Sequence, residues 1–307
     1  MRTHHKIILA VLLLGAAGLW LMTKNQESLK ITSAPQKERL SRPDAQQVRE
    51  TRWPKLIDHR LPLETRLNIA RSIESSLSSR ECAELFALMR HRPHAGDENK
   101  WWVVLNELME QMRKHGAGAN DYTSTLAAIL ADDSLPEVTR DYAAQQLAQW
   151  ISPANPESPG ETKPARRQAA LSVFAKVISD ENLTRTTIPG SALMALTDAS
   201  LRLPEEETVS LWEKLDPVLL ELIEGVRPGE ITLRVSAIQS AALRHTEIHL
   251  PSIRAFANND KADPSLRLSS IAALGQYADA EDREILTQLA NSKTRFQHAA
   301  KAALQKF

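Results

Sequence analysis

The sequence predicts an all-α fold in which helical hairpins stack side by side into an α-α superhelix, or solenoid. The main observation is a helical stretch that recurs along the chain and is clearest at 263–274 (DPSLRLSSIAAL). It has a Pro or Asp at its start, an Arg in the first turn, and small residues before a Leu. A second observation is that alternating runs of Val, Ile, Thr and Tyr are nearly absent, which leaves little to build a sheet. A third is an apolar N-terminal stretch that adds one helix outside the solenoid.

Composition excludes several kinds of site. Among the 307 residues, Lys plus Arg and Asp plus Glu both number 38, and this balance argues against a nucleic-acid partner, which usually binds a basic surface. Cys82 is the only cysteine, so the chain cannot form an internal disulfide or a cysteine-based zinc site. No positioned base accompanies Cys82, and we therefore expect a small buried helix residue rather than a nucleophile.

The N-terminus has the organisation of a membrane-targeting segment. Residues 1–6 form a basic region, and residues 7–22 contain no charge. This apolar stretch is just short of the roughly 20 residues of a transmembrane helix, and it predicts a signal anchor. The positive-inside rule places residues 1–6 in the cytoplasm and the rest of this single-pass chain outside, which is the periplasm in a bacterium. The alternative is a signal peptide cleaved near Gly15–Ala17, which would release a secreted protein.

A flexible tether is predicted to follow, over residues 23–60. This range is polar and charged, lacks sustained apolar periodicity, and is punctuated by Pro35, Pro43 and Pro54. Folded sequence is expected from Leu61, so that the helical repeat domain covers residues 61–307.

Three helices are expected at the start of this domain. The first covers 63–77, the second follows a capping-box spacing between Ser78 and Glu81, and the third covers 98–114. The third contains Trp101 and Trp102, and paired Trp residues could form a stacking platform for a ligand. Because the apolar residues of this helix recur at helical spacing, core packing is the favoured interpretation.

The remaining helices repeat at intervals of around 30 residues. The range 137–150 (EVTRDYAAQQLAQW) repeats the pattern of 263–274, and a degenerate copy is expected at 190–203. Shorter partner helices are predicted at 121–131, 251–258 and 282–290. A hairpin of this size cannot bury its apolar face alone, so neighbouring hairpins must stack. The Arg residues that define this register are Arg140, Arg167, Arg234, Arg267 and Arg295.

These pairs resemble HEAT repeats, whose second helix carries a Pro or Asp start, then Val-Arg, Ala-Ala and Leu. The resemblance is good over 121–150 and 229–307, weaker over 161–225, and only suggestive over 61–115. It implies a scaffold that binds another protein. It also implies that Arg140, Arg234 and Arg267 are structural ladder residues that bond neighbouring turns, rather than a ligand site.

Residues 152–163 (SPANPESPGETK) interrupt the array and are expected to form an exposed loop. Insertions on one face of a solenoid are often places of binding. A variable loop without a partner is nevertheless the favoured interpretation.

The sequence contains no convincing arrangement of catalytic, cofactor-binding or metal-ligating residues. His245 and His249 have the i, i+4 spacing of a helical metal pair, but Pro251 follows closely and the HExxH glutamate is missing. His91 and His94 flank a Pro, which disturbs helical presentation. We therefore expect a protein that is not an enzyme, needs no cofactor and holds no metal, with binding residues unknown.

The leading functional hypothesis is a membrane-tethered, outward-facing scaffold that binds a protein partner of unknown identity and no nucleic acid. One rival is an enzyme, since some HEAT-like folds resemble alkylpurine DNA glycosylases, which use Trp and Asp residues in a basic cleft. Trp101, Trp102, Trp150 and Asp141 would be the candidates, whereas the neutral charge and the anchor oppose this hypothesis. A second rival is a purely structural envelope protein.

Overall fold

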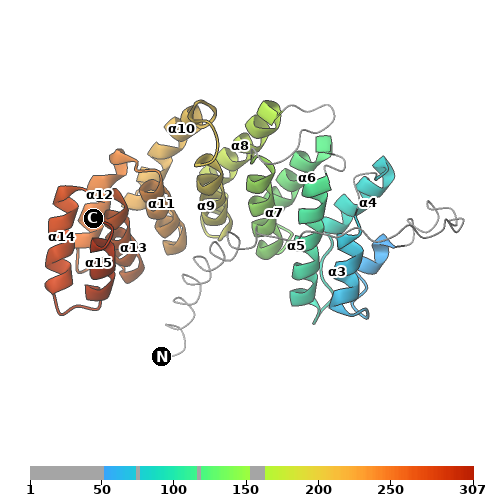
Figure 1. Cartoon of the computed structure of the whole chain (residues 1–307), viewed down its shortest axis with the longest axis horizontal. Helices are drawn as coiled ribbons and strands as arrows, with labels where there is room; N and C mark the ends of the chain where they lie inside the picture. The colour runs from blue at the N-terminus through green and yellow to red at the C-terminus, as the bar shows by residue number, and fades with distance from the viewer. Residues whose placement is uncertain (1–51, 74–76, 116–118, 153–162) are drawn as a thin grey trace, which may run out of the picture. The chain divides into compact units, whose positions relative to one another are not determined.

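The computed structural model describes residues 52–73, 77–115, 119–152 and 163–307, which all belong to one compact unit, Gln46–Phe307. These described ranges contain thirteen α-helices and three short 3-10 helices, and no strand occurs within them. The all-helical, solenoid-like part of the prediction is therefore confirmed (Figure 1).

The helices alternate between two layers. The odd layer contains every helix with an odd number, and the even layer contains the others. The odd layer comprises α3 (Leu63–Arg71), α5 (Glu98–His115), α7 (Glu137–Trp150), α9 (Ile188–Ser200), α11 (Ile231–Leu243), α13 (Pro264–Tyr277) and α15 (Gln297–Leu304). The even layer comprises α4 (Ser79–Met89), α6 (Ala119–Ala131), α8 (Lys163–Ser179), α10 (Glu205–Glu224), α12 (Leu250–Asn258) and α14 (Ala280–Asn291).

Contacts between neighbours define the stacking. Each odd helix packs against the next odd helix from α3 to α15, and each even helix packs against the odd helix that follows it in the chain. From α6 onward, each even helix also contacts the next even helix. Every hairpin therefore contacts mainly the hairpins on either side of it, as in a solenoid.

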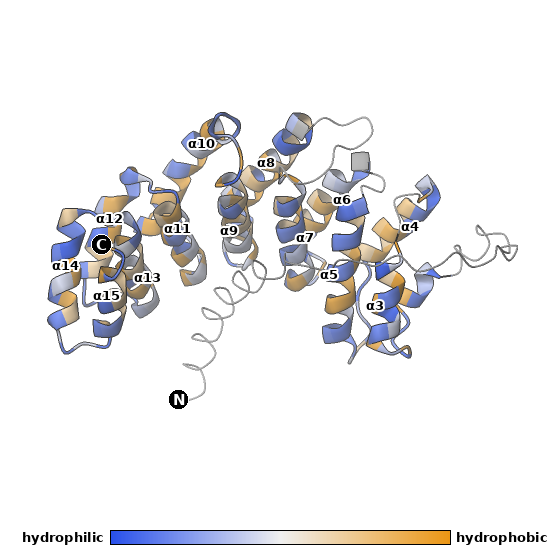
Figure 2. Ribbon diagram, viewed as in Figure 1, coloured by the Kyte–Doolittle hydropathy of each residue, from blue (hydrophilic) through white to orange (hydrophobic). Residues whose placement is uncertain are grey.

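The core is continuous through this stack. Buried apolar side chains run from Trp53 to Ala303, and in Figure 2 apolar and polar residues alternate around most of the helices. A helix that has a neighbouring helix on each side and a second layer behind it buries most of its circumference. Small side chains on such a helix allow the neighbouring helices to pack closely. At Gly275, an added Cβ would lie 2.8 Å from the Cβ of Ala303, so α13 and α15 pack in close contact.

The packed structure begins before Leu61. Trp53–Leu56 forms a 3-10 helix, η1, in which Trp53 and Leu56 are fully buried. The Arg52 guanidinium lies 4.0 Å from the centroid of the Trp53 ring. Residues 52–60, which fall within the range expected as tether, thus belong to the folded unit because Trp53 and Leu56 anchor them in its core.

Local helix signals are partly confirmed. Ser78 and Glu81 form the expected capping box, in which the Ser78 amide donates to Glu81 Oε2 at 2.9 Å. Asp263 caps α13 by accepting from the Ser265 amide at 2.8 Å. In contrast, α3 ends at Arg71 rather than at residue 77.

Several sequence predictions lie outside the described residues. They concern residues 1–6, the apolar stretch 7–22, most of the tether and the loop at 153–162. Within the part of the chain that the structure describes, no helix has both the length and the apolar character needed to cross a membrane.

Candidate functional site

Four arginines occupy the same position in their helices, four residues after the N-cap. Each donates from Nε to a backbone carbonyl near the end of the preceding helix, where carbonyls lack the regular bond to an amide four residues later. A positive charge at this position also interacts favourably with the negative end of the helix dipole. We call these residues the arginine clamps. They join Arg66 to Leu56 O at 2.8 Å, Arg140 to Leu130 O at 2.9 Å, Arg234 to Leu222 O at 3.0 Å, and Arg267 to Ala257 O at 3.1 Å.

The clamps differ from the predicted ladder in where they act. They bond the two helices of one hairpin, for example α6 to α7 through Arg140, rather than neighbouring repeats. Arg167 lies on the even helix α8 and donates to Ile151 O at 3.1 Å, so it does not share the register. Arg295 precedes α15, is exposed, and lies over the Phe296 ring. Sequence reasoning missed Arg66, although Pro62 stands four residues before it, as Pro136 does before Arg140.

With the clamps bound, the exposed positions of α9, α11 and α13 form a surface almost without charge. Each of these helices contains one residue that is charged at neutral pH: Asp198, which pairs with Arg202, and the clamps Arg234 and Arg267. Helical spacing places most of the other half-buried and exposed residues on one side of each helix. We call this surface the odd-layer face, and its residues are Ser191, Met194, Ala195, Thr232, Val235, Gln239, Ser265, Leu268, Ala272 and Gln276.

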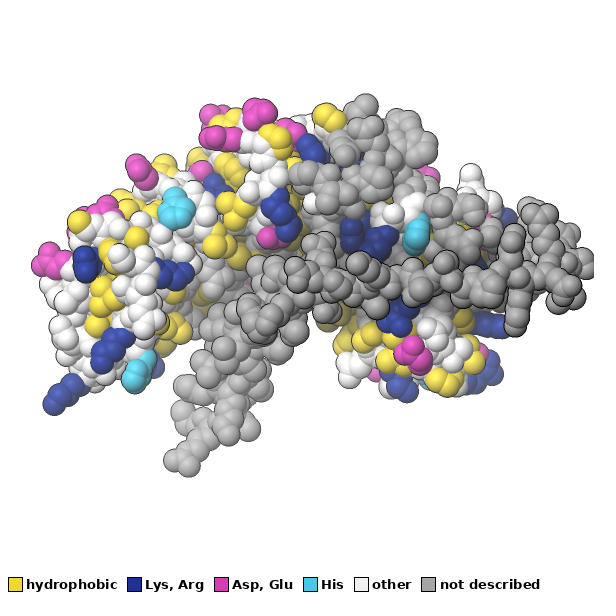
Figure 3. Space-filling view, in the orientation of Figure 1, with side chains coloured by type: hydrophobic (Ala, Val, Ile, Leu, Met, Phe, Trp, Pro, Cys, Tyr) yellow, Lys and Arg dark blue, Asp and Glu magenta, His cyan; other side chains and the backbone are white. Residues whose placement is uncertain are grey.

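The even layer has a different surface. Its longest helix, α10, has three acidic residues in its first turn and further charges along its length. Figure 3 shows acidic side chains gathered over α10. The odd-layer face and the surface of α10 therefore differ in charge.

Asp141 borders the odd-layer face. It lies on α7, is half-buried, and hydrogen-bonds with Ser191 of α9. Burial raises the pKa of Asp141, while the Ser191 hydrogen bond lowers it in part and the nearby Glu137 raises it further. The net upward shift makes Asp141 a weaker acid than an ordinary Asp.

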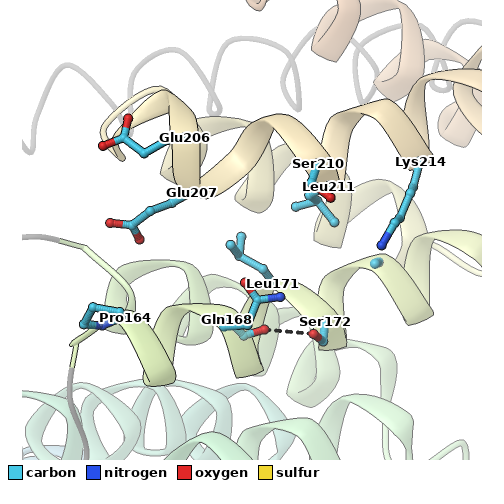
Figure 4. Close-up of a pocket in the computed structure, with 10 residues that line it drawn as sticks. Pro164, Gln168, Leu171, Ser172, Glu206, Glu207, Ser210, Leu211 and Lys214 are labelled. Atoms are coloured by element: carbon cyan, nitrogen blue, oxygen red, sulfur yellow. Dashed lines mark hydrogen bonds between the residues drawn. The ribbon is translucent and has the colours of Figure 1, made fainter.

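A groove of about 370 Å³ separates α8 and α10 (Figure 4). Leu171 and Leu211 are its apolar floor. Glu206 and Glu207 stand at one end, and Lys214 stands at the other with its amino group directed toward α8. Glu207 is fixed by Arg167, whose Nη1 lies 2.5 Å from Glu207 Oε1. The remaining lining residues are Pro164, Gln168, Ser172, Ala175 and Ser210.

The aromatic residues that the sequence suggested as a ligand platform lie in the core. Trp101 is 1% exposed and packs edge-on against His91, and Trp150 is fully buried against Tyr122. Trp102 is half-buried against the core. Neither Trp101 nor Trp150 offers a ring face to a ligand, so these residues do not form a stacking cleft with Asp141.

The single cysteine and the paired histidines also have structural surroundings. Cys82 is buried, and burial followed by the charge of Glu81 raises its thiol pKa, opposite to the shift a nucleophilic thiolate requires. His245 packs against Tyr277, whereas His249 Nε2 lies 3.3 Å from Asp216 Oδ1. The two rings therefore do not share a ligand, and no group of three His, Cys, Asp or Glu side chains in the described ranges could hold a metal ion.

One polar cluster was not expected from the sequence. Asp216 on α10 accepts from Arg244 Nη2 at 2.5 Å and from His249, and the Arg244 guanidinium stacks 3.6 Å from the centroid of the Trp212 ring. Burial raises the pKa of Asp216, but the hydrogen bonds from His249 and Arg244 outweigh it and leave the pKa below its ordinary value. The partners are separated by 28 and 33 residues, so no local spacing signals the cluster.

Comparison with known proteins gives one distant structural likeness. No protein-family model and no curated protein sequence matches the chain. Among solved structures, the chain is similar to human deoxyhypusine hydroxylase in complex with glycerol, at a TM-score of 0.34 and 14% identity, over 85% of this chain and 96% of that one. That protein is an enzyme, which contradicts our prediction that this chain is not one, and the prediction is withdrawn. A likeness at this level assigns no activity to the chain.

Proposed function

We propose that the chain is a membrane-tethered scaffold of HEAT-like repeats whose odd-layer face binds a protein partner on the non-cytoplasmic side of the membrane. The basic residues 1–6 and the uncharged residues 7–22 support the tether. The recurrence of the arginine register at Arg140, Arg234 and Arg267 supports the repeat class.

The main support for the binding proposal is that the odd-layer face has few charged residues. Soluble surfaces usually contain about 25–35% charged residues, whereas the centres of protein–protein interfaces are depleted of them. Here three neighbouring helices present Thr, Ser, Gln, Ala, Val, Leu and Met, and their two arginines are bound to backbone carbonyls. Such a surface loses little polar solvation when a partner covers it.

Site-specific photocrosslinking in intact membranes tests the proposal. A photoreactive residue replaces Gln239 on the odd-layer face or Glu213 on the even layer of the full chain. We expect a discrete crosslinked partner from position 239 and none from position 213, because only the first position lies in the proposed interface.

A charge placed on each layer provides the matched control. Thr232→Arg adds a charge to the odd-layer face, and Thr287→Arg adds the same charge to an exposed threonine of α14 in the even layer. We expect Thr232→Arg to abolish the crosslink at position 239 and Thr287→Arg to leave it unchanged. Equal crosslinking from both layers, or equal effects of both substitutions, would contradict the proposal.

A further inference from the structure

We propose that the groove between α8 and α10 binds a short extended peptide segment of a partner, in which a basic side chain and a carboxylate stand four residues apart. This surface is separate from the odd-layer face. The inference rests on the proposed function only in that the ligand is a protein segment.

The charges at the two ends of the groove set the spacing of the ligand. Glu206 and Lys214 are eight residues apart on α10, or about 12 Å along the helix at 1.5 Å per residue. Both side chains are exposed, and within the described residues neither has a hydrogen-bond or ion-pair partner. An extended chain advances about 3.3 Å per residue, so about four residues span this distance. A cation opposite Glu206 and an anion opposite Lys214 would satisfy both charges.

The alternation of side chains in an extended segment determines which type of residue is preferred at its middle position. Residues i, i+2 and i+4 point to the same side of the chain. If residues i and i+4 carry the charges, residue i+2 points into the groove, where Leu171 and Leu211 form the floor. The preferred ligand therefore has a Lys or Arg, then an apolar residue two positions later, and then an acidic residue two positions after that.

The rims favour an extended segment over a helix. The Gln168 amide and the Ser210 hydroxyl line the groove, and within the described ranges neither side chain makes a hydrogen bond to another group. An extended peptide has free N–H and C=O groups that need such partners, whereas a helix satisfies its own.

The test is a titration of the full chain, in detergent, with a fluorescently labelled and end-blocked peptide, lysine–serine–leucine–serine–glutamate. The control peptide, serine–lysine–leucine–glutamate–serine, has the same composition, but its charges lie on the side opposite to its leucine. Fluorescence anisotropy is expected to show saturable binding of the first peptide only. Equal affinity for both peptides, or no binding of the first, would overturn the proposal.

Variants locate the binding site. Glu206→Lys and Lys214→Glu are each expected to weaken binding by about threefold to tenfold, the range for loss and reversal of one exposed charge contact. The controls Glu213→Lys on α10 and Lys176→Glu on α8 make the same two kinds of charge reversal outside the groove, and they should leave affinity unchanged.

Ser210→Trp fills the groove from an exposed position and should abolish binding while far-ultraviolet circular dichroism stays the same. Binding that survives Ser210→Trp would overturn the proposal. If the groove does not bind the peptide, the crosslink at Gln239 is still expected. The two experiments therefore distinguish failure of the groove proposal from failure of the proposed function.

Discussion

At the scale of single residues, the fold depends on charged groups whose hydrogen bonds are made within the protein. Arg140 is 2% exposed, and its guanidinium bonds the end of α6 while its own helix, α7, is just beginning. Removal of such a side chain leaves both a carbonyl without its donor and a void. The arginine clamps therefore stabilise the turns of the hairpins that contain them, the points at which an isolated helix pair would separate first.

Substitution of a clamp tests this role. Arg140→Ala should lower the free energy of unfolding by about 2–3 kcal/mol, because a buried charged hydrogen bond and its packing are lost together. Arg140→Lys should recover only part of this, since an ammonium cannot reproduce the guanidinium fork. Urea denaturation measures both, with exposed Arg185→Ala as the control, expected within about 0.5 kcal/mol of wild type. A loss no larger than that of the control would show that the clamp does not stabilise the hairpin.

Asp216 predicts how stability depends on pH. Its native pKa lies below the ordinary value of 3.8, so the folded state binds the proton more weakly than the unfolded state. The stability it contributes is present above that ordinary value and is lost as the pH falls through the native pKa. Asp216→Asn should therefore be less stable than wild type near neutral pH, and the difference should shrink below pH 3.8.

Thermal unfolding monitored by circular dichroism across this range measures the effect. Exposed Asp133→Asn serves as the control, because it removes one carboxylate outside the Asp216 cluster. A constant difference between Asp216→Asn and wild type across the acid range would contradict the linkage.

At the scale of elements, close approach of small residues decides how one hairpin seats on the next. The last helix, α15, depends on this most, because it packs on α13 and α14 and no described helix follows it. A Cβ at Gly275 would lie 2.8 Å from the Cβ of Ala303 and 2.9 Å from its carbonyl oxygen. These neighbours are backbone or directly attached to it, so only a shift of the helix can relieve the clash.

Gly275→Ala should therefore displace α15 and destabilise it by about 1–3 kcal/mol, the usual range for overpacking. Hydrogen exchange of residues 297–304 should accelerate while exchange within α5 stays unchanged. Ala303→Gly in the same background should restore part of the protection, because it removes the Cβ contact and leaves the carbonyl contact. Unchanged exchange in α15 would show that the two helices can separate without loss.

The helices and their contacts also show which features of the fold and of the candidate site could be predicted from the sequence. The hairpins and the shared register of Arg140, Arg234 and Arg267 were predictable because a cap, an Arg and small residues recur within one helix. That each arginine bonds within its own hairpin was not predicted. Arg66 carries the same local signal but stands in a less regular region. The Asp216 cluster and the α8–α10 groove depend on how helices far apart in sequence face one another, and local periodicity does not encode this.

At the scale of the whole described unit, each hairpin is stabilised by its neighbours rather than by a common centre. Within the odd layer, each helix packs against the odd helices next to it in the stack, and even helices from α6 onward pack against neighbouring even helices in the same way. Stability in such an array is the sum of hairpin terms and nearest-neighbour interfaces. A defect is therefore expected to act mainly on the hairpins beside it.

Two matched core truncations test this. Leu196→Ala on α9 and Leu286→Ala on α14 each remove a fully buried leucine, which generally destabilises by about 2–5 kcal/mol. Hydrogen exchange measured by mass spectrometry should accelerate around α7–α11 for the first and around α12–α15 for the second, with α3 protected in both. Uniform acceleration along the whole chain would indicate a single cooperative unit instead.

The placement of the arginine clamps inside the hairpins has a mechanical consequence. Each clamped pair of helices behaves as a stiff link, while the joints between links include small side chains such as Gly190, where an added Cβ would lie 3.1 Å from Ser236 Oγ. Small side chains can slide past one another more easily than a buried guanidinium can leave its carbonyl. A pulling force on the two ends should therefore open the joints first and extend the chain in steps of one hairpin, with the clamped turns yielding last.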